Sequence, residues 1–245
     1  MGSAASQRSC HLGAALQTLG ARARREGFYL DDEPGHTQAR LDLQEKSVGA
    51  AERDEEKRSA WREGVKLLDP QRLVFVDECG THIGLTPLRA RAPKGERAFG
   101  RAPRNRGKNT TLIAALSSEG MRAPMSVEGA TDSIAFEIYV EHFLCPALLA
   151  GQVIILDNLG AHKGGRVEEL IKSRGCELLF LPSYSPDFSP IEEAFSKIKA
   201  IVRKAEARTR EGLLEAIAQA LEAVTRQDAK GWFAHCGYHL ETQRS

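Results

Sequence analysis

Short apolar runs alternate with polar segments along the chain, and two of these runs end on an aspartate. Val153–Leu156 consists of four branched aliphatic residues and is followed by Asp157. Leu73–Val76 is also apolar and is followed by Asp77; in both segments a Gly lies three residues after the Asp and a His five residues after it. A continuous apolar run of this length, bounded by turn residues, is typical of a strand buried on both faces. We therefore predict two buried strands, each of which ends at its Asp.

The rest of the pattern predicts further strands and a series of helices. The additional strand-like segments are 82–88, 97–99, 109–117, 125–129 and 176–181. Helical periodicity and capping residues predict helices over 48–66, 133–149, 163–174 and 190–204, and a last one that starts at Thr209. The predicted buried side of the second helix consists of Ile134, Phe136, Ile138, Val140, Phe143 and Leu144. This order of elements implies an α/β fold with a mixed β-sheet flanked by helices, in which the two Asp-bearing strands are parallel.

Composition places the chain among soluble globular proteins and limits the kinds of site it can carry. Its 245 residues, of which 42% are hydrophobic and 27% charged, suffice for one medium domain and a small appendage. The five cysteines are scattered without a Cys-x-x-Cys pair, which indicates a reducing compartment and argues against a zinc site. No apolar run approaches the roughly 18 residues that cross a bilayer. We predict a cytoplasmic protein that makes no contact with a membrane.

The carboxylates that follow the predicted strands form a candidate metal site. Two parallel neighbouring strands would bring Asp77 and Asp157 to the same edge of the sheet, where like charges are unfavourable unless a cation lies between them. Hard oxygen ligands of this kind suit Mg²⁺ or Mn²⁺. A third carboxylate comes from the helix that begins at Pro190, because Glu192 and Glu193 lie in its first turn and Ser189 is its expected N-cap. Acidic residues at that position also complement the helix dipole, so this alternative covers one of the two glutamates.

A basic segment lies between the first Asp-bearing strand and the next strand. The net charge of the chain is only +1, so a nucleic-acid surface has to be a local patch. The alternative is a solvated loop, but the cations are interleaved with Pro and Gly and opposed only by Glu96. We therefore interpret the segment as a phosphate-contacting surface. Its cations are Arg89, Arg91, Lys94, Arg97, Arg101, Arg104, Arg106 and Lys108.

Taken together, these motifs resemble those of the DDE transposases, and in particular the bacterial insertion-sequence transposases related to mariner elements. The resemblance covers about Trp61 to Leu240. It is carried by Asp77 after an apolar strand, by Asp157-Asn158-x-x-x-His162, and by Glu192 in Ser-Pro-Ile-Glu-Glu, with thirty-four residues between Asp157 and Glu192. Supporting matches are Gly107–Thr111, Leu179–Asp187 and Phe195-x-Lys197-x-Lys199.

The resemblance implies an RNase H-like fold and a metal-binding catalytic triad of Asp77, Asp157 and Glu192. By spacing, Glu192 is preferred to Glu193, which lies about 100° further round the helix. The triad would hold two Mg²⁺ or Mn²⁺ ions roughly 4 Å apart. The implied reaction is strand cleavage at transposon ends followed by strand transfer into target DNA, carried out on double-stranded DNA by a homodimer at the nucleoid. Residues expected beside the site are Glu78, Asn158, His162, Lys163 and Glu193; for His162 and Lys163 the alternative is capping of the following helix.

The predicted domain organisation departs from the family at the N-terminus. Residues 1–68 are expected to form a poorly defined segment with one charged helix, and residues 69–245 the RNase H-like catalytic domain. Family members carry helix-turn-helix modules ahead of the catalytic domain, so we expect a truncated DNA-binding region here.

Two alternative functions stay open. The chain could be a catalytically silent transposase remnant that binds DNA through its basic segment. Alternatively, Asp77-Glu78-Cys79-Gly80-Thr81 resembles the Asp-x-Asp-Gly-Thr loop of haloacid-dehalogenase-like phosphatases, although Cys79 replaces the second Asp.

Overall fold

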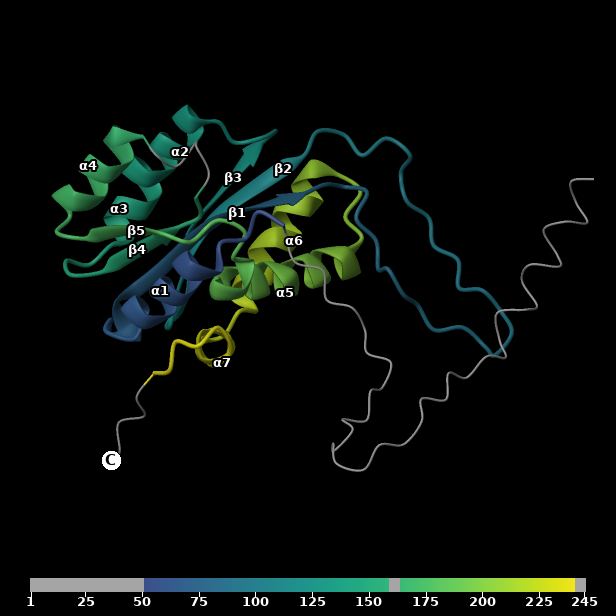
Figure 1. The fold of residues 1–245 in the computed structure, drawn as a ribbon. Coiled ribbons are helices and arrows are strands. Elements are labelled where there is room, and N and C mark those ends of the chain that lie inside the picture. Colours follow the sequence, from purple (N-terminus) through teal and green to yellow (C-terminus); the bar gives the residue numbers. More distant parts are fainter. Residues whose placement is uncertain (1–50, 159–163, 241–245) are drawn as a thin grey trace, which may run out of the picture. The chain divides into compact units, whose positions relative to one another are not determined.

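A five-stranded mixed β-sheet forms the centre of the fold in the computed structural model, which describes residues 51–158 and 164–240 (Figure 1). The spatial order of the strands is β3-β2-β1-β4-β5. Strands β1, β2 and β3 pair antiparallel, whereas β4 pairs parallel with β1 and β5 pairs parallel with β4. The predicted mixed sheet and the parallel pairing of the two Asp-bearing strands are therefore confirmed. The strands are β1 Leu73–Thr81, β2 Thr110–Ser117, β3 Gly120–Glu128, β4 Val153–Leu156 and β5 Glu177–Phe180.

Helices cover both faces of the sheet. One face carries α2 (Ser133–Tyr139), the π-helical turn η2 (Val140–Leu144), α3 (Cys145–Ala147) and α4 (Gly165–Ser173). The other face carries α5 (Pro190–Ala205), α6 (Arg210–Glu222) and α7 (Arg226–His235) (Figure 1). The remaining helix is α1 (Glu55–Val65), which begins after Asp54, whose side chain accepts a hydrogen bond from the Lys57 amide. Short 3₁₀ turns lie at Pro70–Arg72 (η1) and Pro186–Phe188 (η4).

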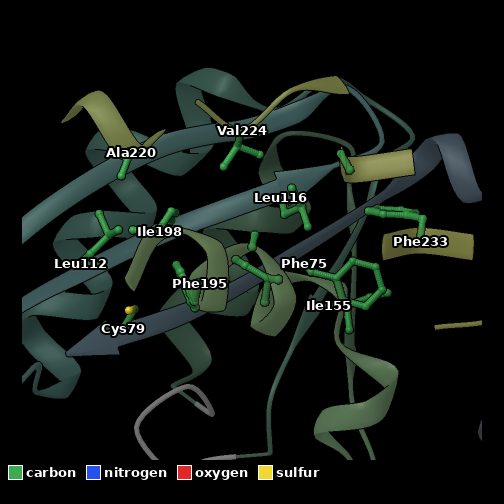
Figure 2. Close-up of a cluster of buried hydrophobic side chains, with 14 of the residues drawn as sticks. Phe75, Cys79, Leu112, Leu116, Ile155, Phe195, Ile198, Ala220, Val224 and Phe233 are labelled. Atoms are coloured by element: carbon green, nitrogen blue, oxygen red, sulfur yellow. The ribbon is translucent and has the colours of Figure 1, made fainter. Parts of the chain in front are cut away.

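The alternation of side chains along the strands produces two hydrophobic cores. Phe75 and Ile155 point to the face covered by α5, α6 and α7, where they meet Phe195 and Phe233 (Figure 2). Val74 and Ile154 point to the opposite core, under α2 and α4. Because successive residues of a strand face opposite sides, a strand between two helical layers has to be apolar at every position. This explains why both apolar runs are continuous.

Three secondary-structure predictions differ from the structure. The first Asp-bearing strand does not end at Asp77: β1 continues to Thr81, because β2 pairs with it as far as Thr110. The second difference concerns 82–88 and 97–99, which contain no strand. Residues 82–109, all within the described part of the chain, instead form a long excursion between β1 and β2 (Figure 1). The third is α7, which lies beyond the last helix predicted from the sequence.

The helical segment 133–147 buries only half of the face that was predicted to be buried. Phe136 and Tyr139 are fully buried, as are Val140 and Leu144 in the π-helical turn. Ile134, Ile138 and Phe143 were predicted to be buried, but they are 67%, 48% and 40% exposed. Apolar residues surround most of this helix, so periodicity alone does not select the face that contacts the sheet.

No helix within the described ranges is long and apolar enough to cross a membrane.

Candidate active site

The end of strand β4 brings the two aspartates of the repeated pattern together. The last parallel partners are Val76 and Leu156, so Asp77 and Asp157 occupy the next position on their two strands. Asp157 follows the end of β4, while Asp77 continues in β1 at the point where β1 loses this neighbour. Both side chains are half-buried, and the Glu78 amide donates a 2.7 Å hydrogen bond to Oδ1 of Asp77. The predicted meeting of the two carboxylates is thus observed at one edge of the sheet.

Helix α5 brings Glu192 to the same edge. The helix packs across β1 and β2 through a buried face that includes Ile191, Phe195 and Ile198. Glu192 lies in the first turn, with its side chain exposed, and its amide donates to the carbonyl of Ser189 at 3.1 Å. Ser189 has the backbone conformation of an N-cap, but its hydroxyl makes no capping hydrogen bond within the described residues, which corrects the expected capping role. The apolar face of α5 therefore orients Glu192.

Asp77, Asp157 and Glu192 line a single open cleft of roughly 420 Å³. One wall is the end of the sheet, and the other is the loop between β5 and α5. Three acidic side chains that share a cleft repel one another, so the arrangement favours a bound cation. The full set of lining residues is Asp77, Glu78, Asp157, Asn158, Leu181, Pro182, Ser183, Tyr184, Ser185, Pro186, Ser189 and Glu192.

The residues expected beside the triad have different positions. Glu78 and Asn158 line the cleft, and the Asn158 side-chain amide donates to the Ser183 hydroxyl at 2.8 Å. Glu193 is absent from the cleft lining and its carboxylate instead contacts Nδ1 of His235 on α7. His162 and Lys163 lie outside the described residues.

A lysine two turns along α5 from Glu192 adds positive charge near the carboxylates, although it is not part of the cleft lining. Lys199 follows Glu192 by seven residues, or about two helical turns, so both lie on one side of α5. Burial raises the pKa of the Cys79 thiol, and the nearby Lys199 ammonium acts in the opposite direction. The carboxylates of Asp77 and Glu192 also contribute to that rise, which places all four groups in one electrostatic environment. The sequence analysis noted Lys199 only as part of a motif.

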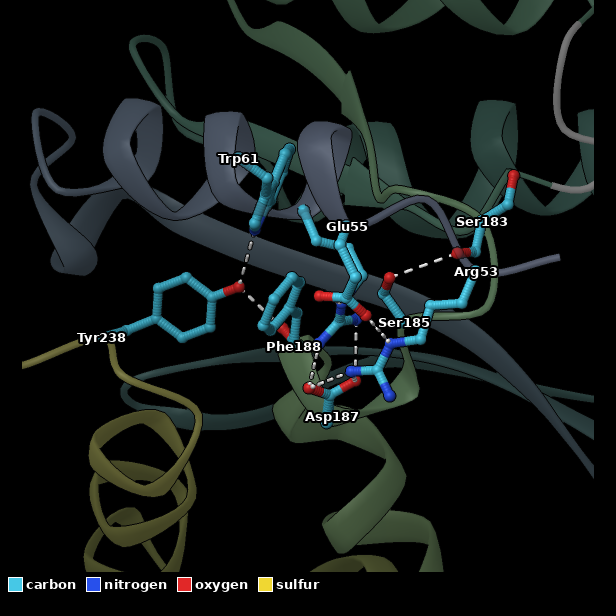
Figure 3. Close-up of polar contacts among 9 residues, drawn as sticks. Arg53, Glu55, Trp61, Ser183, Ser185, Asp187, Phe188 and Tyr238 are labelled. Carbon is cyan, nitrogen blue, oxygen red and sulfur yellow. Dashed lines mark hydrogen bonds and ion pairs between the residues drawn. The ribbon is translucent and has the colours of Figure 1, made fainter. Parts of the chain in front are cut away.

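The loop between β5 and α5 is fastened to α1 by an ion pair that was not predicted. Arg58 was assigned to a solvated helix, but its side chain is fully buried. Its guanidinium donates two hydrogen bonds to the Asp187 carboxylate, at 3.0 and 2.7 Å, and lies 4.2 Å from the centre of the Phe188 ring (Figure 3). This contact holds the pKa of Asp187 below its usual range. The pair could not be predicted from the sequence, because α1 contains many charges of both signs and Asp187 lies 129 residues away from Arg58.

A second connection joins α1 to the same loop through the C-terminal aromatic residues. The indole of Trp61 donates to the Tyr238 hydroxyl at 3.4 Å, and that hydroxyl donates to the carbonyl of Phe188 at 2.7 Å (Figure 3). Trp61, Tyr238 and Phe188 are thus linked across three segments that are far apart in the sequence. The turn that leads into α5, and so to Glu192, is held by both ends of the described chain.

Tyr184 is a cleft residue with an unusual backbone conformation. Its φ of +57° lies in the left-handed region, and its side chain is 57% exposed. A bulky residue rarely adopts this conformation, and such exceptions concentrate at functional sites. Because the sequence places Tyr184 between two Ser residues in a Pro-rich loop, neither hydrophobic nor helical periodicity could identify it.

The eight cations of the basic segment are all exposed along the excursion between β1 and β2. Arg208 holds the base of this excursion by donating hydrogen bonds to the carbonyls of Ile83, Leu85 and Arg101. Two of the predicted cations have local contacts. Lys108 pairs with Glu128 at 2.8 Å. Burial lowers the pKa of His82, and the nearby positive charge of Arg106 lowers it further. Most of the segment is therefore available to an external anionic partner.

Comparison with known proteins locates the cleft within a described family. A family model for DDE superfamily endonucleases matches residues 72–214, which is more than half of the chain and includes Asp77, Asp157 and Glu192. No curated protein sequence is significantly similar to the chain. The phosphatase alternative also loses its motif, because residues 77–81 pair as part of β1 and do not form a loop.

Solved structures of Mos1 transposase share the fold. The pre-cleavage Mos1 transpososome superimposes with a TM-score of 0.60 at 15% identity, over 81% of this chain and 64% of the Mos1 chain. The Mos1 strand transfer complex gives 0.62 at 17% identity, over 82% and 63%. The catalytic domain of Mos1 mariner transposase gives 0.51 at 14% identity, over 75% and 85%. The chain thus spans just under two thirds of the length of the Mos1 chains in the first two complexes, and the predicted RNase H-like fold is confirmed.

Proposed function

This chain belongs to the DDE superfamily endonucleases, and from this premise we propose that it is the catalytic part of a transposase, which cleaves DNA at transposon ends and transfers the cut strand into target DNA. The observation that carries the proposal is the meeting of Asp77, Asp157 and Glu192 in one cleft, although they come from β1, β4 and α5. The division into an N-terminal segment of 1–68 and a catalytic domain of 69–245 belongs to the proposal, with α1 fastened to the catalytic side by Arg58 and Trp61.

The donor set of the cleft fits Mg²⁺ or Mn²⁺. Three carboxylates on rigid elements provide hard oxygen ligands, with two of them half-buried side by side at the edge of the sheet. Asp77, Asp157 and Glu192 would hold the ions, which would supply activation of the attacking water or 3′-hydroxyl and stabilisation of the leaving oxygen. Solved complexes of the mariner Mos1 transposase contain Mg or Mn, which supports the same choice here.

The other residues of the cleft position the substrate. Asn158 is held by Ser183, so the two walls of the cleft are joined by a hydrogen bond beside Asp157. Lys199 supplies a cation close to the carboxylates, suited to a phosphate oxygen. The exposed ring of Tyr184 offers a flat surface on the cleft wall, on which an unpaired base can stack.

Double-stranded DNA is the partner that fits the rest of the surface. The exposed cations at Arg89, Arg91, Lys94, Arg97, Arg101 and Arg104 provide a phosphate-binding segment that begins eight residues after β1. The Mos1 structures include paired-end complexes with transposon DNA, and by analogy we propose a homodimer that assembles on DNA at the nucleoid. The catalytically silent, DNA-binding remnant is the second candidate, favoured by the same basic segment.

Nicking of supercoiled plasmid in Mg²⁺ or Mn²⁺ tests the proposal. We expect metal-dependent nicking that EDTA abolishes and that falls at least about a hundredfold in Asp157→Asn and in Glu192→Gln, because each removes a metal ligand. Glu169→Gln is the matched control: it neutralises an exposed carboxylate on α4 that lies outside the cleft lining, and it should keep most of the activity.

The other outcomes separate the alternatives. Absence of nicking, with DNA binding retained in a gel shift, would favour the silent remnant. Equal losses in Glu192→Gln and Glu169→Gln would contradict the assignment of Glu192 as the third ligand.

A further inference from the structure

A second group of potential metal ligands lies outside the catalytic cleft, where the C-terminus of α7 meets the first turn of α5. It consists of Glu193, His235 and Cys236, and one donor atom from each lies within 4.8 Å of the other two. The carboxylate of Glu193 already contacts Nδ1 of His235. Glu193 follows Glu192 directly, so this group lies one residue from the proposed catalytic triad but is absent from its cleft lining.

The backbone that carries these three side chains is well fixed. Cys236 ends α7, and its amide bonds to the carbonyl of Trp232 at 3.0 Å. The start of α7 is tied to α5 because the Lys197 ammonium donates to the Asp228 carboxylate at 2.7 Å. The two helices therefore hold Glu193 opposite His235 and Cys236 before any ligand binds.

The Cys236 side chain packs at the margin of the core formed with α5, α6 and α7, but its thiol differs from two other buried thiols in its hydrogen bonding. The buried thiols of Cys145 and Cys176 donate to backbone carbonyls of Leu170 and Leu149. For Cys236, no hydrogen bond from the thiol is found within residues 51–158 and 164–240, although the side chain is half-buried. A Glu193–His235 ion pair would account for two members of the group, whereas a shared cation would account for the approach of all three donor atoms.

The combination of donors selects the class of ion. A thiolate sulfur, an imidazole nitrogen and a carboxylate oxygen suit Zn²⁺ and similar transition metals, whereas Mg²⁺ prefers oxygen ligands only. Around a tetrahedral zinc ion the ligand atoms lie roughly 3.3–3.6 Å apart. Side-chain rotation can bring donors from within 4.8 Å to that separation, since the backbone is already in place. Three protein ligands leave a fourth position for water.

We propose that Glu193, His235 and Cys236 bind a zinc-class divalent cation that fastens the end of α7 to the first turn of α5. The lack of a Cys-x-x-Cys pair argued against a zinc site in the sequence, but a site with one thiolate needs no such pair. The cation stabilises the turn that presents Glu192 and is separate from the ions that the catalytic cleft would bind.

Titration of the purified full-length protein with Co²⁺ tests the site, since Co²⁺ commonly occupies zinc sites. A thiolate ligand produces a sulfur-to-cobalt charge-transfer band in the near-ultraviolet, which carboxylate ligands alone do not produce. We expect the band to appear at one Co²⁺ per chain, to disappear on addition of Zn²⁺ and to be lost in Cys236→Ser. His235→Gln and Glu193→Gln should weaken Co²⁺ binding at least tenfold.

Matched variants keep this test independent of the proposed transposase function. Cys176→Ser and Cys10→Ser should keep the band, because they remove other thiols, and Asp157→Asn should keep it because it alters only the catalytic cleft. Addition of Zn²⁺ at about a hundred times its dissociation constant should raise the melting temperature by roughly 5 °C in the wild type and not in Cys236→Ser. A missing band in the wild type, or a band that survives Cys236→Ser, would overturn the proposal even if plasmid nicking succeeds.

Discussion

Arg58 shows how a single buried charge connects helix α1 to the loop beside the candidate site. A guanidinium without contact with water is unfavourable unless it is paired and hydrogen-bonded. Here the pairing comes from Asp187, with the Phe188 ring above the guanidinium and Glu55 at 3.4 Å from Nε. The pair fixes α1 to the turn that precedes Glu192, so its contribution concerns position as well as stability.

Removal of Asp187 should be costly because it leaves the Arg58 charge buried without its main partner. We expect Asp187→Ala to lower the free energy of unfolding by about 3 kcal/mol, at the low end for a broken buried pair because Asp187 itself is 47% exposed. Urea denaturation measures this change. The control is Glu63→Ala, which breaks a Lys66–Glu63 pair whose side chains are mostly exposed and should cost less than about 0.5 kcal/mol. Similar losses in the two variants would contradict the structural role of Arg58.

Asp228 should make stability depend on pH in the acid range. Its carboxylate accepts hydrogen bonds from Lys197 and Thr225, which lower its pKa from 3.8 to about 2. The folded state therefore favours the charged form. The resulting stabilisation is complete above the unfolded pKa, near 3.9, and is lost as the pH falls towards about 2. In melting curves, Asp228→Asn should melt below the wild type at pH 6, and this difference should narrow by pH 2. A difference that stays constant with pH would contradict this prediction.

At the scale of elements, the helical segment 133–147 shows that an apolar residue is not necessarily a buried one. Its sequence contains apolar residues on nearly all sides, and only contact with the sheet makes Phe136 and Tyr139 core residues. Ile134 and Ile138 remain largely exposed. Helix α5 behaves differently, since its buried positions Ile191, Ala194, Phe195, Ile198 and Val202 follow one regular stripe. Its clear amphipathic pattern made the helix predictable, whereas the preference for Glu192 over Glu193 came from the spacing of the family resemblance.

A pair of alanine substitutions tests the observed face of the helix. Phe136→Ala removes a fully buried ring and should cost about 3–5 kcal/mol, whereas Ile134→Ala, at a position 67% exposed, should change stability by less than about 0.5 kcal/mol. Equilibrium unfolding in guanidinium chloride measures both values. The predicted buried set from the sequence requires a large loss for both residues, so a large effect of Ile134→Ala would restore it.

For the molecule as a whole, the distribution of charge matters more than its sum. A net charge of +1 conceals a basic excursion between β1 and β2, while the acidic cleft lies at the end of β4. The excursion supplies exposed cations, and Arg208 anchors its base by hydrogen bonds to backbone carbonyls. In the proposed function, this arrangement would separate a surface that attracts nucleic acid from the position of the chemistry.

The salt dependence of DNA binding should report the basic excursion. Neutralising Arg101, Arg104 and Arg106 to Gln should reduce the magnitude of the slope of log K against log salt by about 2.7, since each phosphate contact contributes roughly 0.9. Fluorescence anisotropy over a salt series measures the slope. Arg166→Gln on α4, which pairs with Glu141, is the control and should leave the slope unchanged. A slope that does not change in the triple variant would contradict a phosphate-binding role for the segment.

Several parts of the fold and of the candidate site could be predicted from the sequence. Local periodicity predicted the two apolar strands that are followed by an Asp. The rules of sheet topology then predicted that these strands pair in parallel and that Asp77 and Asp157 approach each other. Strand β1 was nevertheless predicted too short. The Asp77-to-Thr81 segment stays in the sheet only because β2 supplies hydrogen-bond partners from 29 to 37 residues further along the chain.

The sequence by itself determined which segments are strands and helices in most of the core. The reason is that the spacing of apolar residues follows the number of residues per turn of a helix or the alternation of a strand, and both are local properties. It did not determine which side chains meet across the molecule. Only the tertiary structure decided three contacts: Arg58 is buried against Asp187, Glu193 turns towards His235 and Cys236, and the Tyr238 hydroxyl donates to the Phe188 carbonyl. These contacts join residues at least 42 positions apart, and they depend on how whole elements pack, which no local period records.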